Sequence, residues 1–255
     1  MKLSIIIPAY NESAGVAETA ESVRAIWATL KAQYEVEIIF VNDGSKDNTE
    51  DLLHQTFADE PAIIILSHKV NRGLGAALRT GFAQASGDIV VTTDFDGTYR
   101  FESIPLLVSQ LLAENVDIVT ASPYHPSGKV EGVPAYRLTF SFGASLIYRL
   151  LVNWHIHTWT ALFRAYRLAV IKQVSFQSDD FLAGTELLVN AIHQGFTVAE
   201  FPTTLHVRTF GQSNIRIAKV TLAHLKFQRS IIWNALRGKR AGTGIAQNPP
   251  SSEKV

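Results

Sequence analysis

Short apolar runs alternate with longer stretches that place apolar residues at helical spacing, from the first residues of the chain onward. The runs are typical of β-strands, and the stretches carry apolar residues every three or four positions. The predicted strands cover residues 3–7, 36–41, 62–66, 89–93 and 117–121. The predicted helices between them cover residues 13–31, 47–57, 73–85 and 104–113. This alternation predicts an α/β protein with parallel βαβ units in a doubly wound sheet.

The fourth predicted strand ends in two carboxylates. Its β-branched run is typical of a strand buried on both faces, and Asp94 and Asp96 follow it directly. Ligands of open α/β sheets bind at the carboxyl ends of the strands. If the strand continued, both carboxylates would lie on one face and repel by about 4 kcal/mol at an effective dielectric constant of 20. A divalent cation would relieve that repulsion; the alternative is an acidic turn that caps the next helix.

Polar residues also follow the first two strands. Asn11 and Glu12 end the first, and Asp43 with Gly44 ends the second, where the pair also suits a simple tight turn. Residues 71–77 begin a helix with two glycines, which would let a diphosphate approach backbone N–H groups or let the helix pack closely. The chain lacks the GxxxxGK[ST] pattern, and no GxGxxG follows the first strand. The pattern therefore favours a nucleotide diphosphate with a metal over a P-loop or a dehydrogenase.

Composition and charge narrow the class of protein. The 255 residues are 47% hydrophobic and contain no cysteine, which excludes disulfides and thiolate metal sites. The net charge of zero conceals a basic segment, because residues 205–240 hold eight Lys or Arg and no Asp or Glu. Such a segment indicates an anionic partner, such as a membrane surface or polyphosphate. We see neither a signal peptide nor a membrane-spanning run, and expect a cytoplasmic protein on the cytoplasmic face of a membrane, with no nucleic-acid partner.

Three motifs together resemble a known family. Residues 5–12 (IIIPAYNE), residues 41–49 (VNDGSKDNT) and Asp94-Phe95-Asp96 resemble those of inverting family-2 glycosyltransferases with the GT-A fold. Residues 163–167, 184–188 and 208–213 resemble the dolichol- or polyprenyl-phosphate sugar (mannose) synthases among them. The resemblance covers roughly residues 3–213. It implies transfer, with inversion, of a mannose- or glucose-type sugar from a nucleotide-diphosphate sugar to a polyprenyl or dolichyl phosphate.

The resemblance also implies roles for single residues. Asp94 and Asp96 would bind Mg²⁺ or Mn²⁺, and the catalytic residues would be Asp96, Glu186 and Arg208. The acceptor or its phosphate would meet Arg164, Arg208 and Ser213. The donor nucleotide pocket would be lined by Pro8, Ala9, Tyr10, Asn11, Glu12, Asp43 and Asp94.

Two other functions stay open. If the acceptor is a hydroxyl, a carboxylate base is required, and the candidates are Asp179, Asp180 and Glu186. Glu186 matches the family's acidic position best, although it could instead anchor the adjacent loop. The other alternative is a non-catalytic nucleotide-sugar-binding protein, because fold does not secure function.

The chain departs from the lipid-phosphate branch at three positions. Thr98 stands where an amide or acidic metal ligand is usual, Pro123 where an arginine is frequent, and Asn214 where a lysine is usual. The missing arginine is a candidate phosphate contact. Candidates to replace it are Arg137, Arg164 and Arg208.

The C-terminal half is less clearly patterned. Residues 138–152 are poor in charge, which suits a buried helix or one in contact with a membrane. A predicted helix over 215–237 has an apolar face formed by Ile217, Val220, His224, Phe227, Ile231 and Ala235. Lys219, Lys226, Arg229 and Arg237 lie opposite it, as in helices on membrane surfaces or helices with a solvated basic face. We assign no metal site to His155 and His157, which lack a neighbouring carboxylate. The predicted organisation is a catalytic domain (1–213), a basic helix (214–240) and a disordered tail (241–255).

Overall fold

A seven-stranded mixed sheet forms the centre of the molecule, in the order β3-β2-β1-β4-β7-β5-β8. The computed structural model describes residues 1–208 and 217–238, without the side chains of residues 135–137. All neighbouring strands run parallel except that β7 is antiparallel to β4 and to β5. The strands of this sheet are β1 (Lys2–Ala9), β2 (Glu35–Asn42), β3 (Ile63–Ser67), β4 (Ile89–Thr92), β5 (Ile118–Ser122), β7 (Arg164–Arg167) and β8 (Val198–Pro202).

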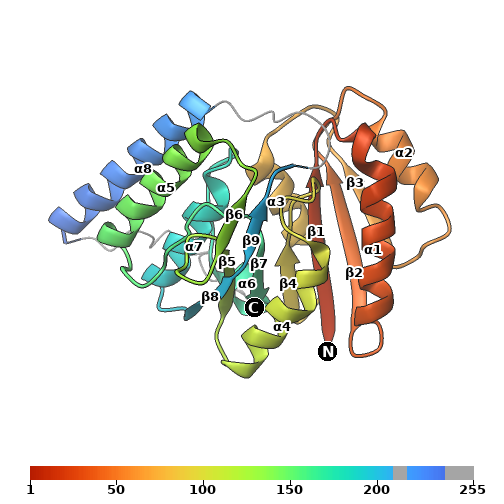
Figure 1. Ribbon diagram of the computed structural model, residues 1–255, viewed down its shortest axis with the longest axis horizontal. Helices are drawn as coiled ribbons and strands as arrows, with labels where there is room; N and C mark the ends of the chain where they lie inside the picture. The colour runs from red at the N-terminus through yellow and green to blue at the C-terminus, as the bar shows by residue number, and fades with distance from the viewer. Residues whose placement is uncertain (209–216, 239–255) are drawn as a thin grey trace, which may run out of the picture.

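Helices cover both faces of the sheet, and two more pack against each other at its flank (Figure 1). The helices are α1 (Val16–Leu30), α2 (Thr49–Thr56), α3 (Leu74–Gln84), α4 (Ile104–Ala113), α5 (Ala135–Leu151), α6 (Leu168–Gln173), α7 (Ala183–His193) and α8 (Ile217–Leu236). Two short 3-10 turns, η1 (Ser13–Gly15) and η2 (Phe101–Ser103), precede α1 and α4. The predicted strands and helices are all present, and the α/β class with a mostly parallel sheet is confirmed.

Alternation along β1 explains the layers. Ile5 and Ile7 lie in the core beneath α1 and α4, whereas Ile6 lies on the opposite face with Ala77 of α3. Successive side chains of a strand point to opposite faces, so a run of apolar residues is buried from both sides. The carboxyl ends of the parallel strands meet at one edge, where the polar residues of the predicted site follow them.

A small second sheet carries the chain back to that edge. It pairs β6 (Lys129–Glu131) with β9 (Thr204–His206) in parallel. The backbone N–H of His206 donates to the carbonyl of Thr98 at 3.0 Å, which ties β9 to the segment after Asp96. Arg208 follows β9 directly and is therefore delivered to the end of β4.

The pair formed by α5 and α8 lies on the β8 side of the molecule (Figure 1). Tyr148 of α5 is fully buried, but Phe142 and Leu150 of the same helix are 51% and 68% exposed. Helix α5 is therefore only partly a core helix. No helix in the described ranges is long and apolar enough to cross a membrane.

Helix α8 turns one side towards the protein. His224 and Ile231 of the predicted apolar face are buried, and so is Gln228, which was not predicted there. Ala235, which we placed on that face, is exposed. The outer side mixes cations with exposed Leu222, Leu225, Ile232, Trp233 and Leu236. The predicted boundaries at residues 213 and 240, and the tail beyond, lie outside the described residues.

Candidate functional site

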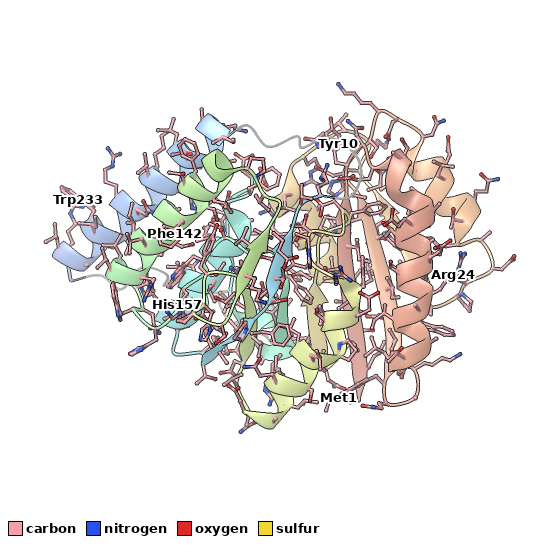
Figure 2. The ribbon with its side chains drawn as sticks, in the orientation of Figure 1. Met1, Tyr10, Arg24, Phe142, His157 and Trp233 are labelled. Carbon is pink, nitrogen blue, oxygen red and sulfur yellow. The ribbon has the colours of Figure 1, made fainter. Side chains whose placement is uncertain are left out.

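A cavity of about 660 Å³ opens at the carboxyl edge of the sheet. We call it the donor cavity, after the predicted donor residues in its wall. It lies between the ends of β1, β2 and β4 on one side and β9 with the start of α8 on the other. Tyr10, which follows β1, marks this edge in Figure 2. The cavity wall includes most of the predicted donor and metal residues: Pro8, Ala9, Tyr10, Glu12, Asp43, Asp94, Asp96 and Arg208.

Arg208 joins two of the acidic residues in this wall. Its Nε donates to Oδ2 of Asp96 at 2.7 Å, and its Nη2 donates to Oε1 of Glu12 at 2.8 Å. Burial opposes the charge of the guanidinium, but the two carboxylates outweigh it and raise the pKa of Arg208. The planar guanidinium can bridge two acceptors in this way, which an ammonium cannot do with the same geometry. The predicted catalytic residues Asp96 and Arg208 therefore lie in direct contact.

Glu12, Asp94 and Asp96 form an acidic cluster in the cavity wall, and two of them have raised pKa values. Burial, with repulsion from Asp96, raises the pKa of Asp94 to about 8. Burial also raises the pKa of Glu12 to about 7, although Arg208 opposes the shift. Oε2 of Glu12 is buried and accepts no hydrogen bond from any residue of the described chain. Among the described residues, the Arg208 guanidinium contacts Glu12 and Asp96 and opposes the pKa shift of Asp94 through its charge.

This donor set fits a hard divalent cation. Carboxylate oxygens are the ligands that Mg²⁺ and Mn²⁺ prefer, and a cation here would relieve both the repulsion and the orphaned oxygen. Asp94 and Asp96 are the residues that would hold it. Thr98 takes a supporting position instead, because its backbone N–H donates to Oδ1 of Asp96 at 3.0 Å and its hydroxyl bonds to the same oxygen.

Asp43 organises the segment between β3 and α3. Oδ1 accepts from His68 Nδ1 at 2.7 Å and from the N–H of Arg72 at 2.9 Å. Oδ2 accepts from Asn71 Nδ2 at 2.9 Å and from the N–H of Gly73 at 2.7 Å. Each oxygen already accepts two hydrogen bonds. The predicted contact of Asp43 with a base or ribose would therefore have to replace one of these four donors.

The glycines before α3 serve close packing. Gly73 has a φ of 97°, in the left-handed region, and a side chain there would collide with the carbonyl of Asp179. The N–H of Gly75 donates to the same carbonyl at 2.8 Å. Of the two roles open for these glycines, the packing role is the one that this geometry supports.

Asn11 does not line the cavity. Its backbone has a φ of 55°, and its side-chain carbonyl accepts the N–H of Lys46 at 2.8 Å. The N–H of Asn11 donates to Ser45 Oγ at 2.9 Å. Asn11 therefore holds the loop after β2 against the end of β1 and acts on the nucleotide pocket only through that loop.

Glu186 and Arg164, two other predicted site residues, do not lie beside Asp94 and Asp96. Glu186 accepts the N–H groups of Gln177 at 3.0 Å and Ser178 at 2.9 Å, which is the loop-anchoring alternative. Arg164 is fully buried in β7. It donates to Thr120 Oγ1 at 2.9 Å and to the carbonyls of Trp159 and Gly184.

Neither Glu186 nor Arg164 lines the donor cavity. Our assignments of Glu186 to catalysis and of Arg164 to the acceptor phosphate are not matched by this geometry. A buried arginine inside a strand and an exposed one look alike in sequence. Ser213 and the side chain of Arg137 lie outside the described residues.

A second, apolar cavity of about 420 Å³ adjoins the first. The two share Asp94, Thr98, Leu162 and other wall residues. Its remaining wall comes mainly from α5 and α8 and the segment after β5, through Tyr124, Phe140, Ala144, Ile147, Val220, Thr221, His224 and Leu225. Sequence spacing gave no sign of this cavity, because it arises from the packing of distant helices.

The donor cavity also contains an ion pair that sequence reasoning missed. Lys219 Nζ lies 3.1 Å from Oδ2 of Asp180, and both residues line the cavity. Lys219 is exposed, as predicted for a cation opposite the apolar face of α8, but it also reaches the cavity wall and pairs with Asp180 there. Asp180 and Lys219 are separated by 39 positions, so no local signal links them.

Comparison with known proteins agrees with this geometry. The family described as glycosyl transferase family 2 matches residues 4–175. The chain is 31% identical over 229 residues to polyprenol monophosphomannose synthase of Mycolicibacterium smegmatis, covering 87% of this chain and 84% of that protein. It is 25% identical to undecaprenyl-phosphate mannosyltransferase of Micrococcus luteus, covering 94% of this chain and 99% of that protein.

The fold is also similar to solved structures. Glucosyl-3-phosphoglycerate synthase of Mycobacterium tuberculosis, crystallised with Mn²⁺, UDP and glucosyl-3-phosphoglycerate, has a TM-score of 0.66 and 22% identity. The match covers 89% of this chain and 79% of that one. Since the family matches most of the chain and its motifs gather in one cavity, this protein belongs to glycosyltransferase family 2 and is a glycosyltransferase with a GT-A-type fold.

Proposed function

We propose that the enzyme transfers a mannose- or glucose-type sugar, with inversion, from a nucleotide-diphosphate sugar to a polyprenyl phosphate. The observation that carries this proposal is the junction of the two cavities at Asp94 and Thr98. A polar, acidic cavity suits a nucleotide diphosphate, and an apolar one beside it suits a prenyl chain. The relatives named as polyprenol and undecaprenyl-phosphate mannosyltransferases support the same pair of substrates.

The residues of the donor cavity would bind the nucleoside, the cation and the phosphate oxygens. Pro8, Ala9 and Tyr10 would form the nucleoside wall, and Asp94 with Asp96 would hold Mg²⁺ or Mn²⁺. When bound, the ion supplies stabilisation of the charge that develops on the leaving diphosphate. Arg208 would release its two carboxylates and bind phosphate oxygens of the donor or acceptor, since it is already oriented at the boundary of the cavity.

A phosphate acceptor needs no strong base, because it is already ionised. This suits a site in which Glu186 is occupied with backbone amides. Catalysis would then depend on positioning and on stabilisation of the leaving group. One observation favours a second candidate, transfer to a hydroxyl: Asp180 is a carboxylate in the donor cavity wall and could act as base once released from Lys219.

We also propose that the outer surface of α5 and α8 lies on an anionic membrane, at its cytoplasmic face. Neither helix contains Asp or Glu. Trp154, after α5, and Trp233 are more than half exposed, and each lies beneath a guanidinium, of Arg149 at 4.3 Å and of Arg237 at 4.4 Å. Exposed aromatic and cationic side chains together suit the headgroup region, where each cation contributes about 1 kcal/mol. Phe142 and Trp233 mark this flank in Figure 2.

A screen of nucleotide sugars against polyprenyl phosphate with Mg²⁺ or Mn²⁺ tests the reaction. We expect labelled sugar in the organic extract with one donor, and none when polyprenol replaces its phosphate. Asp96→Asn is the matched control and should abolish transfer. Donor hydrolysis without a lipid product, or transfer to polyprenol itself, would contradict the proposal and favour a hydroxyl acceptor.

A further inference from the structure

We propose that His125, His157 and Glu200 form a second metal site, for a zinc-type transition-metal ion. The three residues come from the segment between β5 and β6, the segment before β7, and β8. A ligand atom from each lies within 4.8 Å of the other two. This inference is independent of the proposed reaction. In Figure 2, His157 lies well apart from Tyr10, which lines the donor cavity.

Glu200 is built into the protein as the fixed member of the site. Its Oε1 accepts from Ser122 Oγ at 2.6 Å and from the N–H groups of His157 and Thr158 at 2.7 and 3.0 Å. Its Oε2 lies 2.6 Å from Nδ1 of His157. The carboxylate side chain is 8% exposed, and that of His157 is 21% exposed, so solvent ions reach the pair from the histidine side.

His125 stands across from this pair. The rings of His125 and His157 have centroids 5.2 Å apart and cross at 74°. Nδ1 of His125 accepts the N–H of Ser127 at 3.1 Å, a local bond that a turn of the ring would exchange for a metal bond. The loss of one such hydrogen bond costs about 1 kcal/mol, which is small beside a transition-metal ligand bond.

Two imidazoles and one carboxylate define the class of ion. Imidazole nitrogen suits Zn²⁺, Cu²⁺ or Ni²⁺, whereas Mg²⁺ prefers oxygen ligands alone. The ion would enter between Nδ1 of His157 and Oε2 of Glu200, with the ring hydrogen of His157 on Nε2, since neutral imidazole is the form that binds a metal. Ligand atoms around tetrahedral zinc lie about 3.3 Å apart, so His157 would move slightly outwards and His125 inwards. Water would complete the coordination.

The site would connect two segments that border the apolar cavity. Tyr124, next to His125, lines that cavity and packs edge-on against Phe142 of α5, with ring centroids 5.5 Å apart. Thr158, next to His157, lines the same cavity, and its hydroxyl lies 3.2 Å from the N–H of Tyr124, which donates to it. A bound ion would therefore hold the segment after β5 against the wall of the apolar cavity.

Calorimetric titration of tag-free, chelator-treated protein tests the proposal. We expect one Zn²⁺ per chain and no competition from excess Mg²⁺. His125→Asn and His157→Asn should each weaken binding by at least about tenfold. The matched control is His155→Asn, an exposed histidine of the same segment, which should bind as the wild type does.

The possible outcomes separate this site from the donor cavity. Asp96→Asn should leave Zn²⁺ binding unchanged. Absence of Zn²⁺ binding to the wild type, binding that survives in the His125→Asn, His157→Asn double variant, or equal weakening by His155→Asn would each overturn the proposal. Glu200→Gln is a secondary test, used only if its circular dichroism spectrum and melting temperature match those of the wild type, because Glu200 accepts four hydrogen bonds.

Discussion

The hydroxyl of Tyr148 in α5 lies 3.0 Å from Nδ1 of His224 in α8, and both side chains are buried. Burial lowers the pKa of His224 to about 4, below the ordinary 6.5. The unfolded chain therefore binds this proton more tightly, so stability is complete above pH 6.5 and is lost as the pH falls towards 4. We expect a loss of about 3 kcal/mol over this range, measured by urea unfolding at several pH values.

The control for this pH dependence is a histidine that is not buried. His224→Gln should flatten the loss between pH 6.5 and 4, whereas His155→Gln, at an exposed position, should leave the slope unchanged. A slope that persists in His224→Gln would show that other groups cause it.

Arg208 supplies the positive charge of the acidic cluster when no metal is bound. Arg208→Gln leaves Glu12 and Asp96 without their shared partner, so we expect a lower melting temperature in chelator, by an amount equivalent to about 3 kcal/mol or more. Mn²⁺ should restore most of this loss, because a cation can replace the guanidinium. An equal melting temperature with and without Mn²⁺ would argue against metal binding by this cluster.

Arg208→Lys is the matched variant for activity. Lysine keeps the charge but cannot bridge two carboxylates in the same plane. Turnover should fall by roughly tenfold to a hundredfold, which corresponds to about 1.4–2.7 kcal/mol of transition-state stabilisation. A variant with full turnover would show that charge alone is sufficient at this position.

Asp96→Asn should reduce metal-dependent turnover by at least about a hundredfold, because one carboxylate is removed from the pair that would hold the cation. Initial rates across a Mn²⁺ titration measure the effect. Asp179→Asn is a suitable control, since Asp179 is an exposed partner of Arg79 and does not line the donor cavity. Unchanged turnover in Asp96→Asn would defeat the metal mechanism.

Asp43→Asn should destabilise the protein by about 2–3 kcal/mol, since an amide group would face N–H donors where a carboxylate oxygen now accepts them. The KM for the sugar donor should also rise, because the segment before α3 borders the donor cavity. Chemical denaturation and donor titration measure the two effects. A rise in KM without a change in stability would point to direct contact of Asp43 with the nucleotide.

Membrane binding is best tested with cations that face outwards only. Lys226→Glu with Arg229→Glu should weaken sedimentation with anionic vesicles, while Lys219 stays unchanged because it pairs with Asp180. The matched control is Lys31→Glu with Lys172→Glu, which changes the net charge equally at two exposed positions elsewhere. Equal binding by both double variants would contradict a surface specific to α8.

Local pattern was sufficient for strands β1 to β5 and for helices α1 to α5 and α8, whereas the other strands and helices of the described chain were not predicted. The polar groups of the donor cavity, such as Asp43 and Asp96, follow apolar strands whose carboxyl ends meet at one edge of a parallel sheet. Residues that directly follow successive parallel strands along the chain therefore lie close together in space. The same reasoning located the inner face of α8 through His224 and Ile231.

Contacts between side chains from distant segments could not be predicted in this way. Glu200 and His157 are separated by 43 positions, and Asp180 and Lys219 by 39. The direction of Arg164, into the sheet, depends on β7 lying between two strands that precede it. Such contacts depend on topology and have no periodic signature.

The place of β7 also has a consequence for the order of folding. β4 and β5 follow one another along the chain, but they are not neighbours in the central sheet. β7 lies between them and pairs with both. During synthesis, a chain that ends before residue 164 can pair β1 with β2 and β4, and β2 with β3. In that chain β5 has neither of its partners, β7 and β8. The half of the sheet formed by β1 to β4 can therefore assemble while the ribosome is still translating β7 and β8.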